Sequence, residues 1–186
     1  KALTLVKDLV DAGSMSKEVI NWTQGDVMNQ FISGNIAMMV NGPWQVPTMR
    51  EQAPDLNWDV TLLPKDAEYA SCLGGENFGV IDGDNVDAAL DFLQFATSKD
   101  EVASYIDDFG YIAARKDVAE GQFTDDETMQ KFTEEMQYAQ PRGPHAQWPE
   151  ISDALSLAVN ESITGTSAPA DAAAKAQSTI DGILAE

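Results

Sequence analysis

The chain reads QFISGNIAMMVNGPWQVP from Gln30 to Pro47, and this stretch predicts a helix, a strand and a second helix in succession. Phe31 and Ile32 lie one helical turn beyond an apolar pair at 27–28, so the first helix has an apolar face. Gly34 fits the left-handed conformation that commonly ends a helix. The apolar run at 36–40 is typical of a short strand that is covered on both faces.

The second helix of this stretch is expected to begin at Pro43. Proline suits the first position of a helix, because its missing N–H would have no partner there in any case. Trp44 then lies in the first turn, close to backbone N–H groups that have no acceptor within the helix. The sequence therefore predicts a large aromatic ring at a loop-to-helix junction, which is a suitable place to hold a polar ligand.

Elsewhere, apolar periodicity predicts helices that alternate with short strands. Strands are expected at 58–63 and at 73–81, and the second of these contains three glycines, which often mark a bend or a close backbone approach. Two helices are expected to end the chain, one from about Pro149 and one from about Pro169. The residues that the last helix is expected to bury are Ala173, Ala176, Ile180 and Leu184.

Four further segments follow the opening stretch in an order that resembles one family. They are GGENFGV at 74–80, ALDFLQFATSKDEVASYIDDFGYIAAR at 89–115, WPEISDALSLAVNESITG at 148–165 and AAAKAQSTIDGIL at 172–184. In this order the chain resembles the extracellular solute-binding proteins of ATP-driven sugar importers, the group that includes maltodextrin-binding protein. The likeness covers nearly the whole chain but only the C-terminal half of a family member, so it implies that the N-terminal half of the same protein is missing.

The resemblance also implies a fold and a division into segments. The fold is α/β, a periplasmic-binding-protein-like fold of two lobes (type II), of which this chain would be a helix-rich C-terminal portion. Residues 1–74 would form part of the second lobe, residues 75–125 a crossing segment that belongs to the first lobe, and residues 126–186 a helical return to the second lobe.

Composition excludes several classes of function. The chain has 186 residues, and 11 basic against 31 acidic residues give a formal charge of −20, which repels nucleic acid and anionic lipid. No apolar run approaches the roughly 18 residues of a membrane span. Cys72 is the single cysteine, so the chain forms no internal disulfide.

No enzyme signature or metal-binding pattern is found in the sequence. His145 is the only histidine, and a zinc site would therefore depend on carboxylates. The segment DGDNVD at 82–87 fails as a calcium loop, because valine and aspartate occupy positions that need an oxygen ligand and a glycine. Neither a P-loop nor a G-x-S-x-G turn is present. We expect no catalytic residue, no metal and no cofactor.

The remaining residues suit a sugar-binding site. A sugar ring has a weakly apolar face and a rim of hydroxyl groups, so its site combines flat aromatic rings with fixed donors and acceptors. Trp44 and Trp148 are the candidate rings, because each adjoins a proline at a loop-to-helix junction; the alternative is that each indole fills a core. Trp22 and Trp58 are expected to be structural.

Polar contacts are expected from Gly75, Glu76 and Asn77. The glycine lets a ligand approach the backbone, and the two side chains supply an acceptor and a mixed donor and acceptor. The alternative is a bulged strand with solvent-facing side chains, although the resemblance implies that this segment crosses between lobes beside the cleft. Arg142 could contact vicinal hydroxyls or form a surface ion pair. Maltodextrin binders commonly carry an aromatic residue where this chain has Ile151, so their preference does not transfer.

The resemblance implies the substrate-binding component of an ABC transporter. It would capture a sugar or oligosaccharide outside the membrane, in the periplasm or as a cell-surface lipoprotein, and deliver it to the membrane permease subunits. A ligand that bridges the lobes would stabilise a closed form, which the permease recognises. The alternatives are a self-contained acidic helical interaction domain and a glycan-active enzyme with two acidic residues.

Overall fold

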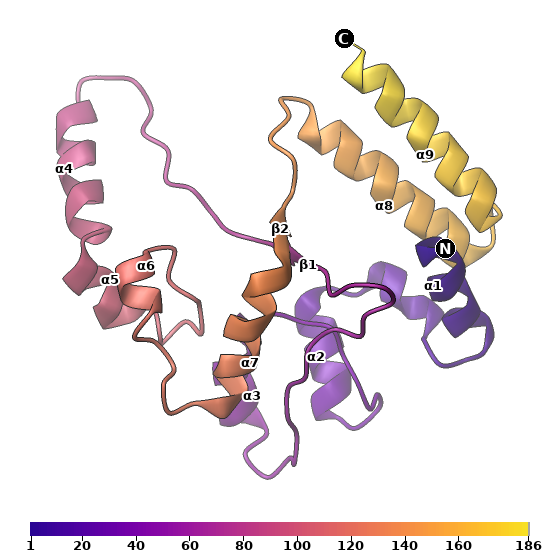
Figure 1. Cartoon of the computed structure of the whole chain (residues 1–186), viewed down its shortest axis with the longest axis horizontal. Coiled ribbons are helices and arrows are strands. Elements are labelled where there is room, and N and C mark those ends of the chain that lie inside the picture. Colours follow the sequence, from indigo (N-terminus) through magenta and orange to yellow (C-terminus); the bar gives the residue numbers. More distant parts are fainter. Residues whose placement is uncertain (186) are drawn as a thin grey trace. The chain divides into compact units, whose positions relative to one another are not determined.

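A computed structural model describes residues 1–185 (Figure 1). The chain divides into two compact units. Unit 1 consists of residues 1–27 together with the chain from Gly143 onward, and unit 2 consists of residues 28–142. These bounds differ from those of the three segments expected from the sequence, whose assignment to lobes of a longer protein stays a prediction.

Unit 1 is helical. The helix α8 (Trp148–Thr164) and the helix α9 (Pro169–Leu184) form an antiparallel hairpin with α1 (Ala2–Asp11) beside it, and a 3-10 turn, η1 (Lys17–Asn21), follows α1 (Figure 1). The two final helices were expected, and the structure confirms both. Gly165 ends α8 in the left-handed region, with a φ of 78°.

One core cluster of unit 1 consists of small side chains. Ala158, Ala172 and Ala176 pack together, and Leu3 of α1 contacts this cluster. The expectation that Ala173 faces inward is wrong: Ala173 is exposed, whereas Ala172 is only 1% exposed. Leu184, also expected inside, is 58% exposed. A run of alanines carries almost no periodic signal, so the inward face could not be identified from it.

Unit 2 holds most of the shorter elements. The chain enters it within α2 (Gln24–Ile32), whose start has a capping box: the Asp26 N–H donates to Thr23 Oγ1 (3.2 Å), and the Thr23 N–H donates to Asp26 Oδ2 (2.7 Å). Gly34 follows α2 with a φ of 72°, which confirms the expected left-handed cap. The later elements are η2 (Pro43–Gln45), α3 (Val46–Gln52), α4 (Val86–Ala96), α5 (Lys99–Tyr105), α6 (Lys116–Ala119), α7 (Glu127–Glu135) and η3 (Met136–Tyr138).

The β structure of the described residues is one short parallel ladder. Strand β1 (Ser71–Leu73) pairs with β2 (Ala139–Pro141), with Ser71 opposite Ala139 and Leu73 opposite Pro141. Tyr69 and Tyr138, just before the two strands, stack with ring centroids 4.8 Å apart.

Three strand predictions are wrong. Residues 36–40 and 58–63 have no strand, and only the first residue of the predicted strand 73–81 belongs to β1. Met38 and Val40, expected inside a sheet, are 86% and 76% exposed. A strand needs a neighbour that accepts and donates its backbone hydrogen bonds, and within the described chain residues 36–40, 58–63 and 74–81 have no such partner strand.

The buried residues of unit 2 include two methionines and one apolar cluster. Met49 of α3 and Met129 of α7 are 1% and 2% exposed, and Val102, Ala113 and Val118 form a cluster around α5 and α6. In contrast, α4 has no buried residue. Within the described chain, no helix is both long and apolar enough to cross a membrane.

Candidate ligand-binding site

Trp44 lies in the 3-10 turn η2, which runs directly into α3. Pro43 is the first residue of η2, as expected, and Gly42 precedes it in an extended conformation. The indole is half-buried. Val46, two residues further along the chain, is 3% exposed and holds the start of α3 in the core. The structure therefore confirms the early-turn position of Trp44; its contact with a ligand stays a prediction.

The indole of Trp44 folds back over Gly42. A Cβ atom built on Gly42 would overlap three carbon atoms of the indole, so any other residue at this position would displace the ring. The Gly42 N–H donates to Asn41 Oδ1 (3.0 Å), which fixes the backbone just before the turn. The pairing of Gly42 with Trp44 is visible in the sequence only as a Gly-Pro-Trp run, and sequence reasoning did not find this contact.

Tyr111 is a second aromatic residue at this site, and sequence reasoning missed it. Its ring centroid lies 6.2 Å from that of Trp44, and the two ring planes are tilted by 42°. Gly110, with a φ of 66°, brings the two segments together: a Cβ there would lie 2.8 Å from the Pro43 carbonyl oxygen and 2.8 Å from Pro47 Cδ. Only glycine allows both this left-handed backbone and this approach.

A cavity of about 240 Å³ adjoins the same contact between Pro47 and Gly110. Its charged lining comes from Arg50, Asp107 and Asp126. Arg50 donates two hydrogen bonds to the Asp126 carboxylate, both 2.8 Å long. The guanidinium hydrogen bonds hold the pKa of Asp126 below its ordinary value, and the carboxylate raises the pKa of Arg50. The pair therefore stays ionised near neutral pH and gives the cavity a fixed wall.

The predicted polar segment Gly75–Asn77 is exposed and lies outside β1. A Cβ at Gly75 would have no protein atom within 4 Å, as would one at Gly74, so contacts among the described residues do not require glycine at either position. The expected close backbone approach thus has no counterpart within the described chain, and the role of Gly75, Glu76 and Asn77 as ligand contacts stays a prediction.

The parallel ladder brings this segment to the same edge as Arg142. Leu73 ends β1 opposite Pro141, which ends β2, so Gly74 and Arg142 leave the sheet at the same end. Ligands of open α/β sheets commonly bind beyond the carboxyl ends of the strands. Five of the six predicted site residues, Trp44, Gly75, Glu76, Asn77 and Arg142, belong to unit 2.

Trp148, the sixth, belongs to unit 1. It is the first residue of α8 and is half-buried. Its backbone N–H donates a hydrogen bond to the His145 carbonyl (3.0 Å). The Gln147 N–H donates to His145 Nδ1 (3.2 Å). His145 thus organises the turn before α8. Among residues 1–185, no three histidine, cysteine or carboxylate side chains come together in a way that could hold a metal ion.

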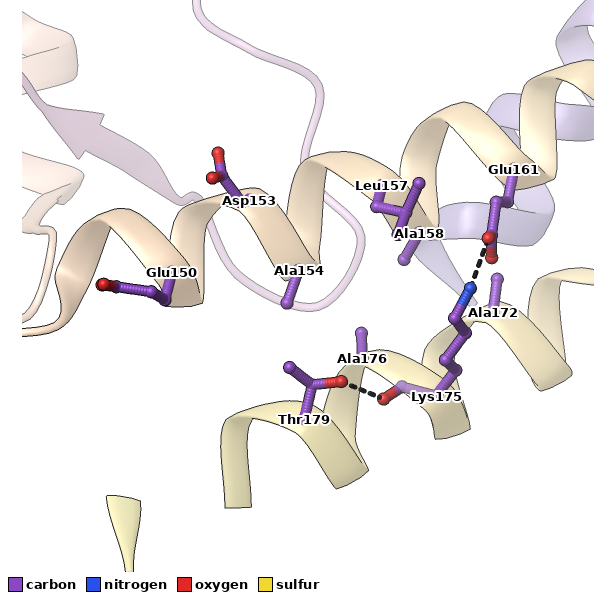
Figure 2. Close-up of a pocket in the computed structure, with 10 residues that line it drawn as sticks. All are labelled: Glu150, Asp153, Ala154, Leu157, Ala158, Glu161, Ala172, Lys175, Ala176 and Thr179. Atoms are coloured by element: carbon purple, nitrogen blue, oxygen red, sulfur yellow. Dashed lines mark hydrogen bonds and ion pairs between the residues drawn. The ribbon is translucent and has the colours of Figure 1, made fainter. Parts of the chain in front are cut away.

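A groove lies between α8 and α9 in unit 1 (Figure 2). It has a volume of about 280 Å³, and Ala158, Ala172 and Ala176 line its floor. Lys175 Nζ reaches across to Glu161 Oε1 (2.6 Å) and joins the two helices at one end of the groove, as Figure 2 shows. Its rim carries the polar residues Glu150, Asp153, Glu161, Lys175 and Thr179, whereas the three alanines belong to the packed core of unit 1. We therefore interpret the groove as the seam of the helix hairpin.

Known proteins resemble this chain along most of its length. Residues 1–133 match the family described as bacterial extracellular solute-binding protein. The chain is 28% identical, over 184 residues, to a protein of Brucella abortus (strain 2308) named "Putative binding protein". Proteins of the same name from Brucella abortus biovar 1 (strain 9-941) and Brucella suis biovar 1 (strain 1330) match to the same extent. The alignment covers 95% of this chain but 45% of the relatives, so the chain spans less than half of their length.

Proposed function

Since this chain belongs to the bacterial extracellular solute-binding proteins, we propose that it is part of the substrate-binding component of an ABC-type importer that captures a sugar or oligosaccharide. The family is extracellular, which places the chain outside the cytoplasm. The printed names of the relatives state binding without naming a ligand. The proposal that the ligand is a carbohydrate therefore rests on the residues of the candidate site.

The observation that carries the choice is the aromatic pair of Trp44 and Tyr111. The two rings are tilted by 42° and both remain partly exposed, Tyr111 by 39%. Two such faces offer dispersion contacts to the C–H groups of a sugar ring, and the carboxylates near them offer acceptors to its hydroxyl groups. A chain of charge −20 also disfavours an anionic solute, so a neutral saccharide is the solute class that fits best.

The remaining contacts to the sugar would come from residues that follow the carboxyl ends of β1 and β2. Arg142 presents a planar group with five N–H donors, and Glu76 and Asn77 follow the neighbouring strand. Trp148 stays a separate predicted ligand contact. In this proposal the ligand stabilises a closed form of the complete protein by binding it more tightly than the open form, and the membrane permease subunits recognise that form.

The experiment is a titration of tryptophan fluorescence with mono- and oligosaccharides. It compares the chain alone with the same chain preceded by its upstream segment, which in the proposal supplies the first half of the protein. We expect a saturable change in the longer form, and weaker or no binding by the chain alone. Trp44→Phe should remove most of the signal, whereas Trp58→Phe is the matched control that should retain it.

Three results would contradict this function. If neither form responds to any saccharide while the longer form binds a peptide or a polyol, the carbohydrate assignment is wrong. If the longer form turns over a glycoside, the protein is an enzyme. If the chain alone binds a basic protein and the longer form binds no solute, the chain is an acidic interaction domain.

A further inference from the structure

We infer that Tyr111 and Phe109 extend Trp44 into a row of three aromatic rings that contacts successive sugar residues of a neutral oligosaccharide. This inference rests on the proposed function and deepens it, because it identifies the length class of the ligand. We call Trp44, Tyr111 and Phe109 the aromatic row. All three residues belong to unit 2.

The rings follow one another at nearly equal spacing. The centroids of Trp44 and Tyr111 lie 6.2 Å apart, and those of Tyr111 and Phe109 lie 6.4 Å apart with their planes tilted by 35°. Phe109 is 58% exposed and Tyr111 is 39% exposed. A single sugar ring covers roughly one aromatic face, so a row of three exposed or half-exposed rings offers contact area that a monosaccharide leaves unused.

The inner end of the row is anchored in the core. Phe109 contacts Tyr105 edge to face, with centroids 6.2 Å apart and planes at 72°. The Tyr105 hydroxyl donates to the Ala96 carbonyl (3.3 Å), and its ring packs against the cluster of Val102, Ala113 and Val118. Phe109 therefore has a fixed neighbour on one edge while the rest of its ring stays open.

The backbone that carries the row is also fixed. Gln122 Nε2 donates to the Tyr111 carbonyl (3.1 Å) and to Asp107 Oδ1 (2.5 Å), and Gln122 Oε1 accepts from the Ala113 N–H (2.7 Å). One side chain thus holds the turn on both sides of Phe109 and Gly110. Preorganised rings lose little conformational entropy on binding, which raises affinity.

The alternative occupant of these rings is an apolar protein surface. An apolar protein surface can pack against apolar side chains of any shape. A sugar ring, in contrast, stacks on a flat aromatic face. The neighbours of the row favour the sugar, because the Asp107 and Asp108 carboxylates are exposed next to the rings and supply hydroxyl acceptors. Ionised groups of this kind are depleted at the centre of protein interfaces.

The test measures affinity against ligand length in the longer form of the protein. The probes are glucose with maltose and maltotriose, glucose with cellobiose and cellotriose, and xylose with xylobiose and xylotriose. Phe109→Ala should weaken trisaccharide binding by about threefold to tenfold and leave monosaccharide binding within about twofold. Tyr111→Ala removes one ring of the proposed sugar contact and should weaken binding of every length. Trp44→Ala should weaken binding of every length.

Conservative variants keep the test independent of folding. Phe109→Tyr and Tyr111→Phe retain a flat ring and should bind like the parent, whereas Phe109→Leu retains apolar volume without a flat face and should bind like Phe109→Ala. The inference would be overturned if Phe109→Leu bound the trisaccharide with the affinity of the parent. It would also be overturned if Phe109→Ala weakened monosaccharide and trisaccharide binding equally. In both cases saccharide binding persists, so the proposed function stands. If the parent binds no saccharide, both proposals fail.

Discussion

Glycine is required at positions 42 and 110 because other atoms of the protein occupy the space that a side chain would need. The Trp44 indole covers Gly42, and the Pro43 carbonyl with the Pro47 ring covers Gly110. Glycine in a sequence usually indicates the end of a helix or strand. That rule does not predict either contact, because both depend on atoms that the fold brings close to the glycine. These two positions set where the aromatic pair lies.

Replacing Gly42 by alanine is expected to displace the Trp44 indole. The added methyl group would overlap the ring, which must rotate away toward solvent. The emission of Trp44 should then shift to the red, and the near-ultraviolet circular dichroism should weaken. Gly83→Ala is the control, because a Cβ at Gly83 has no atom within 4 Å. An unchanged spectrum in the Gly42 variant would contradict the geometry described for this turn.

Asp126 joins two elements through one carboxylate. It caps α7 by accepting from the Met129 N–H (3.1 Å) and accepts both hydrogen bonds from Arg50. Its pKa in the folded protein is lowered from 3.8, first by the Arg50 hydrogen bonds. A lowered folded pKa means that the ionised form stabilises the fold above the unfolded pKa and that this stability is lost as the pH falls through the folded pKa.

The Asp126→Asn variant should therefore differ from the parent in a pH-dependent way. The parent is expected to be more stable at pH 5–8 by a constant amount, and the difference should shrink below about pH 4. Urea unfolding across this range measures it, with the exposed Asp125→Asn as control. Comparing variants removes the general effect of acid on a chain of charge −20. A difference that does not vary with pH would show that the Asp126 charge contributes nothing.

The helix hairpin of unit 1 packs through small side chains. Ala172 is almost fully buried, and Ser162 is fully buried and donates its hydroxyl hydrogen to the Ala158 carbonyl (2.7 Å). Small residues let α8 and α9 approach closely, so the contact has little room for added volume.

Ala172→Leu is expected to destabilise the protein, whereas Ala173→Leu is not. Leucine at the buried position would overpack the hairpin and lower the free energy of unfolding by about 1–3 kcal/mol. The exposed neighbour should change it by no more than about 0.5 kcal/mol. Chemical denaturation with equal m-values measures both. Equal effects of the two substitutions would show that the hairpin does not pack through this face.

Taken as a whole, the chain leaves a large apolar surface exposed. On α4, Leu90, Phe92 and Phe95 are 51%, 61% and 59% exposed, and Phe78 and Ile81 before it are 66% and 91% exposed. Large apolar side chains left exposed in such number indicate an interaction site. The relatives are more than twice as long as the aligned part, so we propose that the rest of such a protein covers this surface.

Phe92→Lys should distinguish the two forms of the protein. Since no residue of α4 is buried here, the substitution should change the stability of the chain alone by no more than about 0.5 kcal/mol. In the longer form it should cost about 2 kcal/mol or more, because a charge would then enter a buried interface. Val102→Ala, in the core of unit 2, should destabilise both forms. An equally small effect of Phe92→Lys in both forms would refute the proposed cover.

The sequence alone determined the features that depend on local chemistry. These are the helices α2, α8 and α9, the left-handed cap at Gly34, the start of η2 at Pro43 and the family, because periodicity, capping residues and motif order are written in the residues. Only the tertiary structure decided which apolar runs become strands and which aromatic residues meet. Strand formation at 36–40 needs a hydrogen-bonding partner. The approach of Tyr111 to Trp44 depends on the contact of Gly110 with Pro43, more than sixty residues away in the chain, and local pattern carries no information about it.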